Sequence, residues 1–255
     1  MADHSETITS AHKSLIVNLK DCLLARVMPR TEQTAGGDLR TRTLLELLGA
    51  YTLILITAWT SGRTQRVLFD ASGGWILLSS LFPRQTRELI GFRLSGLQRS
   101  WWIAATVLAA SGFAVVIAAD VGTLHLPSRI EQLPVRIFGY VVWSFAQQYI
   151  LQDYFLQRLR RLTARTSIAV VTAGLLFALA HLPNLLLTIA ALVWGIASCA
   201  LFMRYRDIYS LGVAHAVLGL CIAFTVPDAI HHGMRVGSGY LTYHAQPISH
   251  STQPD

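Results

Sequence analysis

The sequence predicts an all-α fold, a polytopic bundle of six to seven transmembrane helices. Apolar residues make up 53% of the 255 residues, charged residues only 14%, and the mean hydropathy is +0.45, whereas about a quarter of an ordinary soluble domain is charged. Six apolar runs approach the roughly 20 residues that a helix needs to cross about 30 Å of hydrocarbon. Arginines gather between these runs, a distribution typical of the cytoplasmic loops of membrane proteins.

The N-terminal segment, residues 1–42, is polar, and no cleavable signal peptide is expected in it. Within this segment, residues 14–28 place four apolar side chains at helical spacing beside lysines and an arginine. The pattern is typical of an amphipathic helix on the cytoplasmic membrane surface. A mobile tail is an equally good interpretation.

The predicted transmembrane domain covers residues 43–226. Its six apolar runs each carry at most two charged residues and are 43–60, 101–119, 135–156, 166–182, 185–203 and 209–226. A weaker run, residues 67–82, contains Asp70 and two adjacent glycines, so a seventh span, a re-entrant segment and an interfacial helix are all compatible with it. The polar residues 227–255 are predicted to form a C-terminal tail, with a glycine-punctuated surface loop at 234–240 that could cover the outward mouth of a site.

Basic residues give the predicted topology. They cluster at 158–165 and at 204–206, with the uncharged turn 181–184 between the clusters. Positive residues in short loops stay on the cytoplasmic side, so both clusters are cytoplasmic if the two intervening runs form a hairpin. The basic residues at 84–99 and those in the N-terminal segment can then both be cytoplasmic only if residues 67–82 cross the membrane. Seven spans, a cytoplasmic N-terminus and an outward C-terminus follow.

The net charge of +7 comes from arginines at the ends of apolar runs, where they match anionic lipid headgroups. Membrane lipids are therefore expected partners, and nucleic acid is not, because no nucleic-acid-binding module is recognisable. Cys22, Cys199 and Cys221 have no paired spacing and are interpreted as small buried hydrophobes.

Five polar side chains interrupt the apolar runs. Gln147, Gln148 and Gln152 lie in one run, His181 at the end of another and His215 within the last. Polar groups at bilayer depth are costly and face a protein interior, so these residues mark a candidate site. The simpler interpretation is a hydrogen-bond network between helices, in which each bond contributes about 0.6 kcal/mol.

The two histidines lie in recognisable sequence patterns. Phe177 precedes His181 by four residues in Phe-Ala-Leu-Ala-His-Leu-Pro-Asn184, and His215 is followed four residues later by Gly219. The glutamines come first in the chain and these two patterns follow them. With the motifs in this order, residues of about 140–220 resemble the CPBP family, the CAAX prenyl protease and bacteriocin-processing (Abi) intramembrane endopeptidases. The resemblance implies a CPBP-type helical bundle that hydrolyses a peptide bond.

This chain departs from the family at two motifs. The family's Glu-Glu-x-x-x-Arg reads Gln147-Gln148-x-x-x-Gln152 here, and its His-x-x-x-Asn ends in Gly219. The resemblance implies that Gln147 and His181 stand where a glutamate and a histidine activate water, and that His215 stands where the oxyanion is stabilised. A neutral amide has no basicity, so His181 alone would be the base, with Gln147 or Gln148 positioning the water.

The site is thus predicted from Gln147, Gln148, Gln152, His181 and His215 as catalytic residues. Phe177, Asn184 and Gly219 are predicted to support them or the substrate. No cofactor and no metal are expected, because no HExxH pattern is present, although His231 and His232 could join His181 and His215 as ligands. Asp153 and Glu46 are interpreted as interfacial, with Asp153 pairing with Arg158 or Arg160.

Two functions remain open from the sequence. One is an intramembrane endopeptidase that cleaves a membrane-associated or lipidated peptide with a divergent amide and histidine centre. The other is a catalytically inactive homologue that binds such a peptide or a lipid, as a partner or immunity-type protein. In either case the chain is expected to be a multi-pass integral membrane protein, most simply of a bacterial inner membrane.

Overall fold

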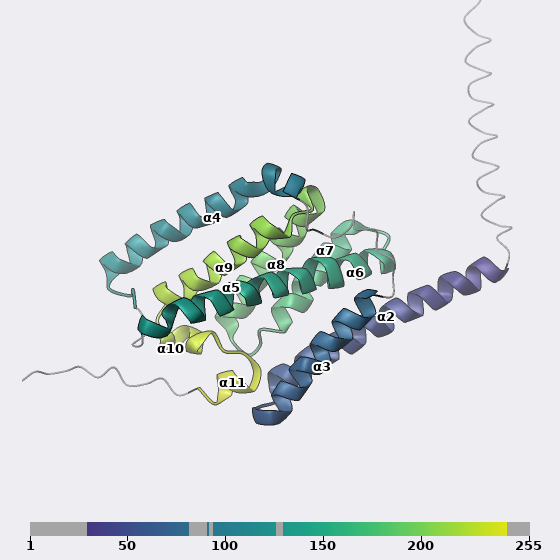
Figure 1. The fold of residues 1–255 in the computed structure, drawn as a ribbon, viewed down its shortest axis with the longest axis horizontal. Helices are drawn as coiled ribbons and strands as arrows, with labels where there is room; N and C mark the ends of the chain where they lie inside the picture. The colour runs from purple at the N-terminus through teal and green to yellow at the C-terminus, as the bar shows by residue number, and fades with distance from the viewer. Residues whose placement is uncertain (1–29, 82–90, 92–93, 126–129, 244–255) are drawn as a thin grey trace, which may run out of the picture. The chain divides into compact units, whose positions relative to one another are not determined.

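The computed structural model describes residues 30–81, 91, 94–125 and 130–243, and these residues form helices and no sheet (Figure 1). The predicted amphipathic helix at 14–28 lies outside the described residues. The chain divides into two compact units, residues 1–45 and 46–255. The described part of the first unit is the beginning of α2 (Arg30–Trp59), where the Thr43 hydroxyl donates to the Leu39 carbonyl oxygen over 2.8 Å.

The second unit contains the remainder of α2 and all later elements. These are α3 (Gly62–Leu81), α4 (Leu94–Val121), the 3-10 turn η1 (Ile130–Gln132), α5 (Leu133–Tyr149), the π-helix η2 (Ile150–Leu156), α6 (Gln157–Leu162), α7 (Thr166–Leu179), α8 (Leu185–Tyr205), α9 (Ile208–Thr225), α10 (Asp228–His231), η3 (His232–Met234) and α11 (Gly237–Leu241). Helix α9 packs against both α4 and α5, and α7 packs against α8 (Figure 1).

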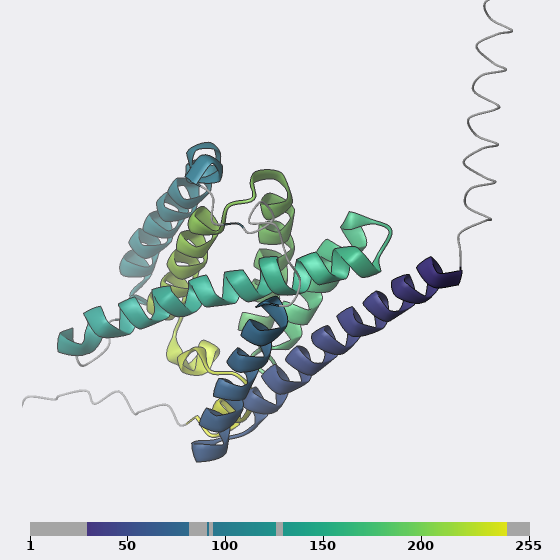
Figure 2. The same cartoon turned by 45° about the vertical axis from the view of Figure 1, so that its right-hand side comes forward.

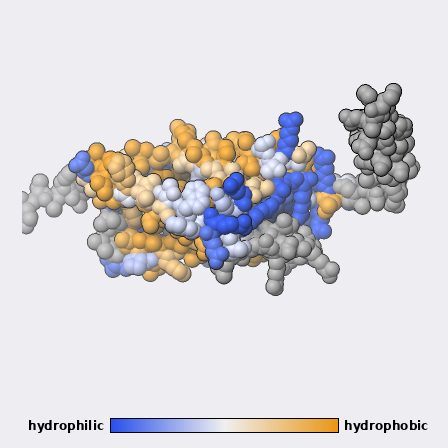
Figure 3. Space-filling model, turned by 90° about the horizontal axis from the view of Figure 1, so that it is seen from above, coloured by the Kyte–Doolittle hydropathy of each residue, from blue (hydrophilic) through white to orange (hydrophobic). Residues whose placement is uncertain are grey.

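Several helices have the length and composition to cross a membrane. Among the described residues these are Gly37–Trp59, Ser95–Val121, Leu185–Tyr205 and Ile208–Thr225, and α7 is a shorter apolar helix. Large apolar side chains are exposed along them and along α5, and they cover much of the face in Figure 3. Such continuous exposed apolar surface suits lipid contact. The count of seven spans and the orientation of the termini stay predictions.

The predicted run 135–156 is more complex than one α-helix. Figure 2 shows α5, η2 and α6 continuing one another as a single long helical element, but its centre is a π-helix, in which each backbone N–H pairs with the carbonyl five residues earlier. Six of the seven π-helical residues are buried, from Leu151 to Leu156, against only two in α5. The wider turn therefore coincides with the most enclosed part of the element.

Helix α3 extends without interruption through its glycine pair at 73–74. The predicted surface loop at 234–240 is also partly different, because η3 and α11 occupy it and Gly237 is buried. The Gly237 backbone N–H donates to the Leu182 carbonyl oxygen over 2.8 Å, which ties this segment to the end of the α7 region. Gly237 adopts a φ of +54°, and a Cβ there would collide with the Ala58 backbone.

A buried arginine joins three helical elements. Arg158 is 1% exposed, and its Nε donates to Glu46 Oε2 over 2.9 Å while its Nη2 donates to the Ser79 carbonyl oxygen over 2.9 Å. Its guanidinium also stacks 3.7 Å from the centre of the Tyr154 ring. The expected pairing of Asp153 with Arg158 is wrong: Asp153 instead accepts a bond from the Gly91 backbone N–H over 3.4 Å.

We expect Arg158→Met to destabilise the protein by about 3 kcal/mol, because it removes the buried guanidinium that pairs with the mostly buried Glu46 carboxylate. The measurement is unfolding of the purified protein in detergent. Arg161→Met, at an exposed position of the same helix, is the control and should unfold like the wild type. Equal stability of the two variants would contradict a structural role for the ion pair.

Candidate functional site

A cavity of about 870 Å³ opens between the helices of the second unit. Residues from α2, α3, α5, η2, α7, α8 and α9 line it, together with Ala180 and His181 after α7 and with Met234 and Val236 of the C-terminal segment. Most of the lining is apolar, and among the described lining residues there is no carboxylate and no cationic Lys or Arg. The polar side-chain groups of its wall are amides, imidazoles, hydroxyls and indoles, and they include Gln147, His181 and His215.

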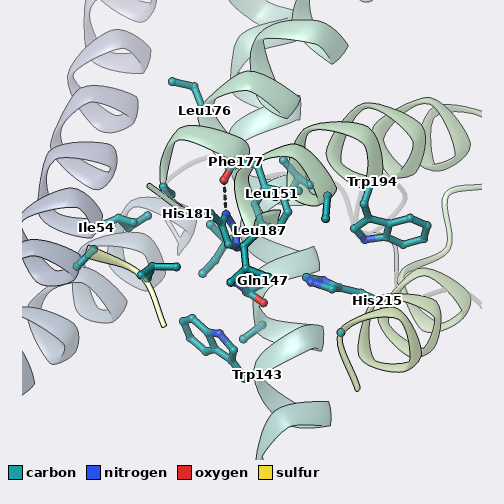
Figure 4. A pocket seen from close by; sticks show the side chains of 18 of the residues that line it. Ile54, Trp143, Gln147, Leu151, Leu176, Phe177, His181, Leu187, Trp194 and His215 are labelled. Carbon is teal, nitrogen blue, oxygen red and sulfur yellow. Dashed lines mark hydrogen bonds between the residues drawn. The ribbon is translucent and has the colours of Figure 1, made fainter. Parts of the chain in front are cut away.

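His181 follows the end of α7 and turns back over its last turn. Its Nδ1 lies 2.7 Å from the Phe177 carbonyl oxygen. Because a carbonyl oxygen only accepts, Nδ1 carries the proton and Nε2 keeps its lone pair. Figure 4 shows this bond and the His181 ring directed toward Gln147. The arrangement gives the cavity a neutral imidazole with a free basic nitrogen.

His215, in α9, is held by a chain of buried amides. The Gln152 Nε2 donates to Ser198 Oγ over 3.0 Å and to Gln148 Oε1 over 3.2 Å. Gln148 therefore presents its Nε2 to His215, whose Nδ1 accepts over 3.1 Å. With Nδ1 acting as an acceptor, the proton of the neutral ring lies on Nε2. The two histidines thus have opposite tautomers, one an acceptor and the other a donor.

The structure brings Gln147 between the two imidazoles. In Figure 4 its amide lies below His181 and beside His215, with Trp143 on the far side. Gln148 and Gln152 are fully buried behind it and do not line the cavity. Of the three glutamines predicted as catalytic, only Gln147 is therefore placed to touch a bound molecule.

Tyr140 is a site residue that the sequence analysis missed. It lines the cavity beside Gly219, and a Cβ added to Gly219 would collide with the Tyr140 hydroxyl and come within 2.6 Å of Cζ. The Tyr140 phenol therefore occupies the space that a side chain at position 219 would fill. Gly219 lies one helical turn after His215. The sequence did contain a signal for Tyr140, because it precedes Gln147 by seven residues, or two turns of helix, and so shares a helix face with it.

The predicted supporting residues have different roles. The Phe177 ring meets the His181 and His215 rings edge to face, with centroids 4.8 and 5.8 Å away. Asn184 is fully buried and caps α8, where its Oδ1 accepts from the Leu187 N–H over 3.2 Å. Its Nδ2 donates to the carbonyl oxygens of His231 and Arg235 over 2.8 and 3.1 Å. Asn184 therefore holds the C-terminal segment rather than lining the cavity.

The remaining candidate ligands lie elsewhere. His231 stacks on His125, and His232 packs on Tyr240 with ring centroids 4.2 Å apart. Neither lines the cavity, so the structure does not bring them to His181 and His215 as a shared metal site. Among the described residues, a separate group of possible ligands is formed by His125, Asp228 and His231.

Residues 129–221 match the model of a protein family described as type II CAAX prenyl endopeptidase Rce1-like. The match begins beside η1 and ends within α9, so it contains Gln147, His181 and His215. The resemblance to CAAX-type endopeptidases of the CPBP family is thereby confirmed over this segment. Comparisons with curated proteins and with solved structures return no match to this chain.

We expect Gly219→Ala to destabilise the protein by about 1–3 kcal/mol, because the new methyl group overlaps the Tyr140 phenol. Combining it with Tyr140→Ala removes the clash, so the two changes should be strongly non-additive in thermal unfolding. Gly139→Ala, whose Cβ would enter open space on α5, is the matched control. A Gly219→Ala protein as stable as this control would show that the contact is not tight.

Proposed function

We propose that this chain, an integral membrane protein with a segment of the CAAX prenyl endopeptidase type, hydrolyses a peptide bond in a membrane-associated, lipidated peptide. The observation that carries the proposal is a pair of imidazoles in the cavity wall that have opposite tautomers. The unprotonated Nε2 of His181 suits a general base, and the Nε2–H of His215 suits an oxyanion donor. The buried Gln152–Gln148 network fixes the His215 tautomer, and the Phe177 carbonyl oxygen fixes that of His181.

The proposed reaction starts with a water held between Gln147 and His181. His181 Nε2 takes a proton from this water as its oxygen bonds to the scissile carbonyl carbon. The oxyanion that forms accepts from His215 Nε2–H and from the Tyr140 hydroxyl. The His181 imidazolium then gives its proton to the leaving nitrogen, the C–N bond breaks, and a carboxylic acid and an amine are released.

The cavity supports an apolar substrate group. It holds about 870 Å³, a size that suits a lipid-like or drug-sized ligand, and its lining carries no charge among the described residues. A prenyl or acyl chain fits this chemistry, and the peptide backbone would lie at the polar wall near Gln147. A prenylated peptide, another lipidated peptide and a bacteriocin leader are the substrate classes to test, and a bacterial inner membrane is the proposed location.

A second function is favoured by one observation, the absence of a carboxylate in the described lining. Gln147 cannot take a proton from water, which leaves His181 as the sole base. An inactive homologue that uses the same cavity to bind a lipidated peptide or a lipid agrees with this chemistry. The two functions differ in one measurable property, turnover.

Peptide cleavage in proteoliposomes separates the two functions. With a panel of prenylated, acylated and leader peptides, we expect slow cleavage by the wild type and a loss of at least about 10²-fold in His181→Ala, which lacks the general base. Gln147→Glu should increase the rate, because a carboxylate can share the proton. His232, which is half-buried and lies outside the cavity, supplies the control variant His232→Ala. A silent wild type with an active Gln147→Glu would show that the natural site is catalytically disabled, and would favour the binding function.

Tyr140→Phe tests the second oxyanion donor. It removes one hydroxyl and keeps the ring, so we expect kcat to fall by about 10²-fold with KM nearly unchanged. His215→Ala should lower kcat at least as much. An unchanged kcat in Tyr140→Phe would mean that the phenol only fills space beside Gly219.

A further inference from the structure

A second cluster of titratable side chains lies beyond the end of α9. His125 follows α4, and Asp228 and His231 belong to α10. One possible ligand atom from each of the three lies within 4.8 Å of those of the other two. The two imidazoles are nearly parallel, with centroids 5.9 Å apart and 15° between planes. Residues more than 100 positions apart in the sequence thus present nitrogen and oxygen donors to one point.

Each histidine has a buried ring nitrogen in this cluster. Nε2 of His125 is buried and makes no hydrogen bond, and the buried Nε2 of His231 faces Asp228 Oδ1 across 3.3 Å without the geometry of a hydrogen bond. His231 is only 2% exposed, so its nitrogen also lacks bulk water. A buried polar atom without a partner is costly unless a ligand, ion or water completes it. Their common position suggests that one ligand satisfies both.

The surroundings of His125 and Asp228 suit metal ligation. His125 Nδ1 donates to the Thr123 carbonyl oxygen over 3.0 Å, which leaves a lone pair on Nε2. Asp228 Oδ2 accepts from the Tyr243 hydroxyl over 2.7 Å, and its Oδ1 faces His231 Nε2 across 3.3 Å. Hydrogen bonds of these two kinds orient ligands in known metal sites. Two imidazoles and a carboxylate with an open position form a familiar zinc ligand set.

The third ligand must change its tautomer. His231 Nδ1 accepts from the Met234 backbone N–H over 3.1 Å, so Nε2 carries the proton when no metal is bound. Ligation through Nε2 moves this proton to Nδ1 and gives up the bond to Met234. The Met234 backbone has a left-handed φ of +58°, which is unfavourable for a residue other than glycine, so releasing it also relieves strain.

The distances require a modest closure. Ligand atoms around a tetrahedral zinc are about 3.4 Å apart for bonds near 2.1 Å, against at most 4.8 Å here. Asp228 is exposed and can move inward. The histidines are already held, because the His125 N–H donates to the Phe224 carbonyl oxygen over 3.0 Å and Asn184 Nδ2 binds the His231 carbonyl oxygen.

We propose that His125, Asp228 and His231 bind a divalent transition metal of the zinc class. The ion would join the segment after α4 to α10, which directly precedes the segment from which Met234 and Val236 reach the cavity wall. The sequence analysis expected no metal, because no HExxH pattern is present, and the histidines that it weighed as ligands did not include His125. His125 becomes a candidate only when the fold brings it beside α10.

Metal uptake by the full chain in detergent tests the proposal. The protein is freed of any histidine tag, treated with chelator and titrated with Co²⁺, whose visible absorption reports nitrogen and oxygen ligation, and bound Zn²⁺ is counted by elemental analysis. We expect one ion per chain and a rise in the unfolding temperature with Zn²⁺. His125→Ala and Asp228→Asn should bind more than tenfold more weakly, and Tyr243→Phe about tenfold more weakly.

Two control variants separate this site from other histidines. His232→Ala, next to the cluster, and His181→Ala, in the cavity, should bind Co²⁺ like the wild type and show the same Zn²⁺-dependent rise in unfolding temperature. Substoichiometric uptake by the wild type, wild-type affinity in His125→Ala, or an equal loss in either control would overturn the proposal. Circular dichroism of His125→Ala distinguishes the loss of a ligand from the loss of fold.

Discussion

Hydrogen bonding in a membrane interior, where water is scarce, is the constraint on which the candidate site depends. Gln148, Gln152 and Ser198 are fully buried, so each must find its partners within the protein. Gln152 donates to the amide oxygen of Gln148, so the Gln148 amide nitrogen donates to His215 Nδ1. This places the His215 proton on Nε2. A carboxylate at 148 would accept from His215 Nδ1 and reverse this tautomer. Glutamine at this position therefore changes the chemistry of the wall as well as its charge.

The same element that carries these amides also holds the bundle together. Gln148 lies at the end of α5, Gln152 and Tyr154 lie in the π-helix, and Arg158 follows in α6. Arg158 binds Glu46 of α2 and the backbone of α3, while Gln148 and Gln152 bind α9 and α8. One continuous helical element thus connects the cavity wall to the surrounding helices. Its buried polar groups make pairing specific, because lipid-facing apolar surfaces alone do not select a partner.

Several features of the site could be predicted from the sequence because their signals are local. Isolated histidines and glutamines in apolar runs are conspicuous, and the spacing of Phe177 before His181 follows one helical turn. Other features could not, because they depend on contacts between distant residues. Nothing in the sequence around Glu46 or Arg158 predicts that the two side chains form an ion pair. A tyrosine in an apolar run is also common, and only the fold shows that Tyr140 lies against Gly219.

By itself the sequence determined the helical class, the apolar runs, the resemblance of residues 140–220 to CAAX-type endopeptidases and three polar residues of the cavity wall. Composition and helical periodicity carry that information, since each depends on neighbours within a few turns. Only the tertiary structure decided the tautomers of His181 and His215, the place of Tyr140, the capping role of Asn184 and the meeting of His125 with Asp228 and His231. These depend on which donor faces which acceptor across helices, and hydrogen bonds are set by distances and angles that no spacing along the chain records.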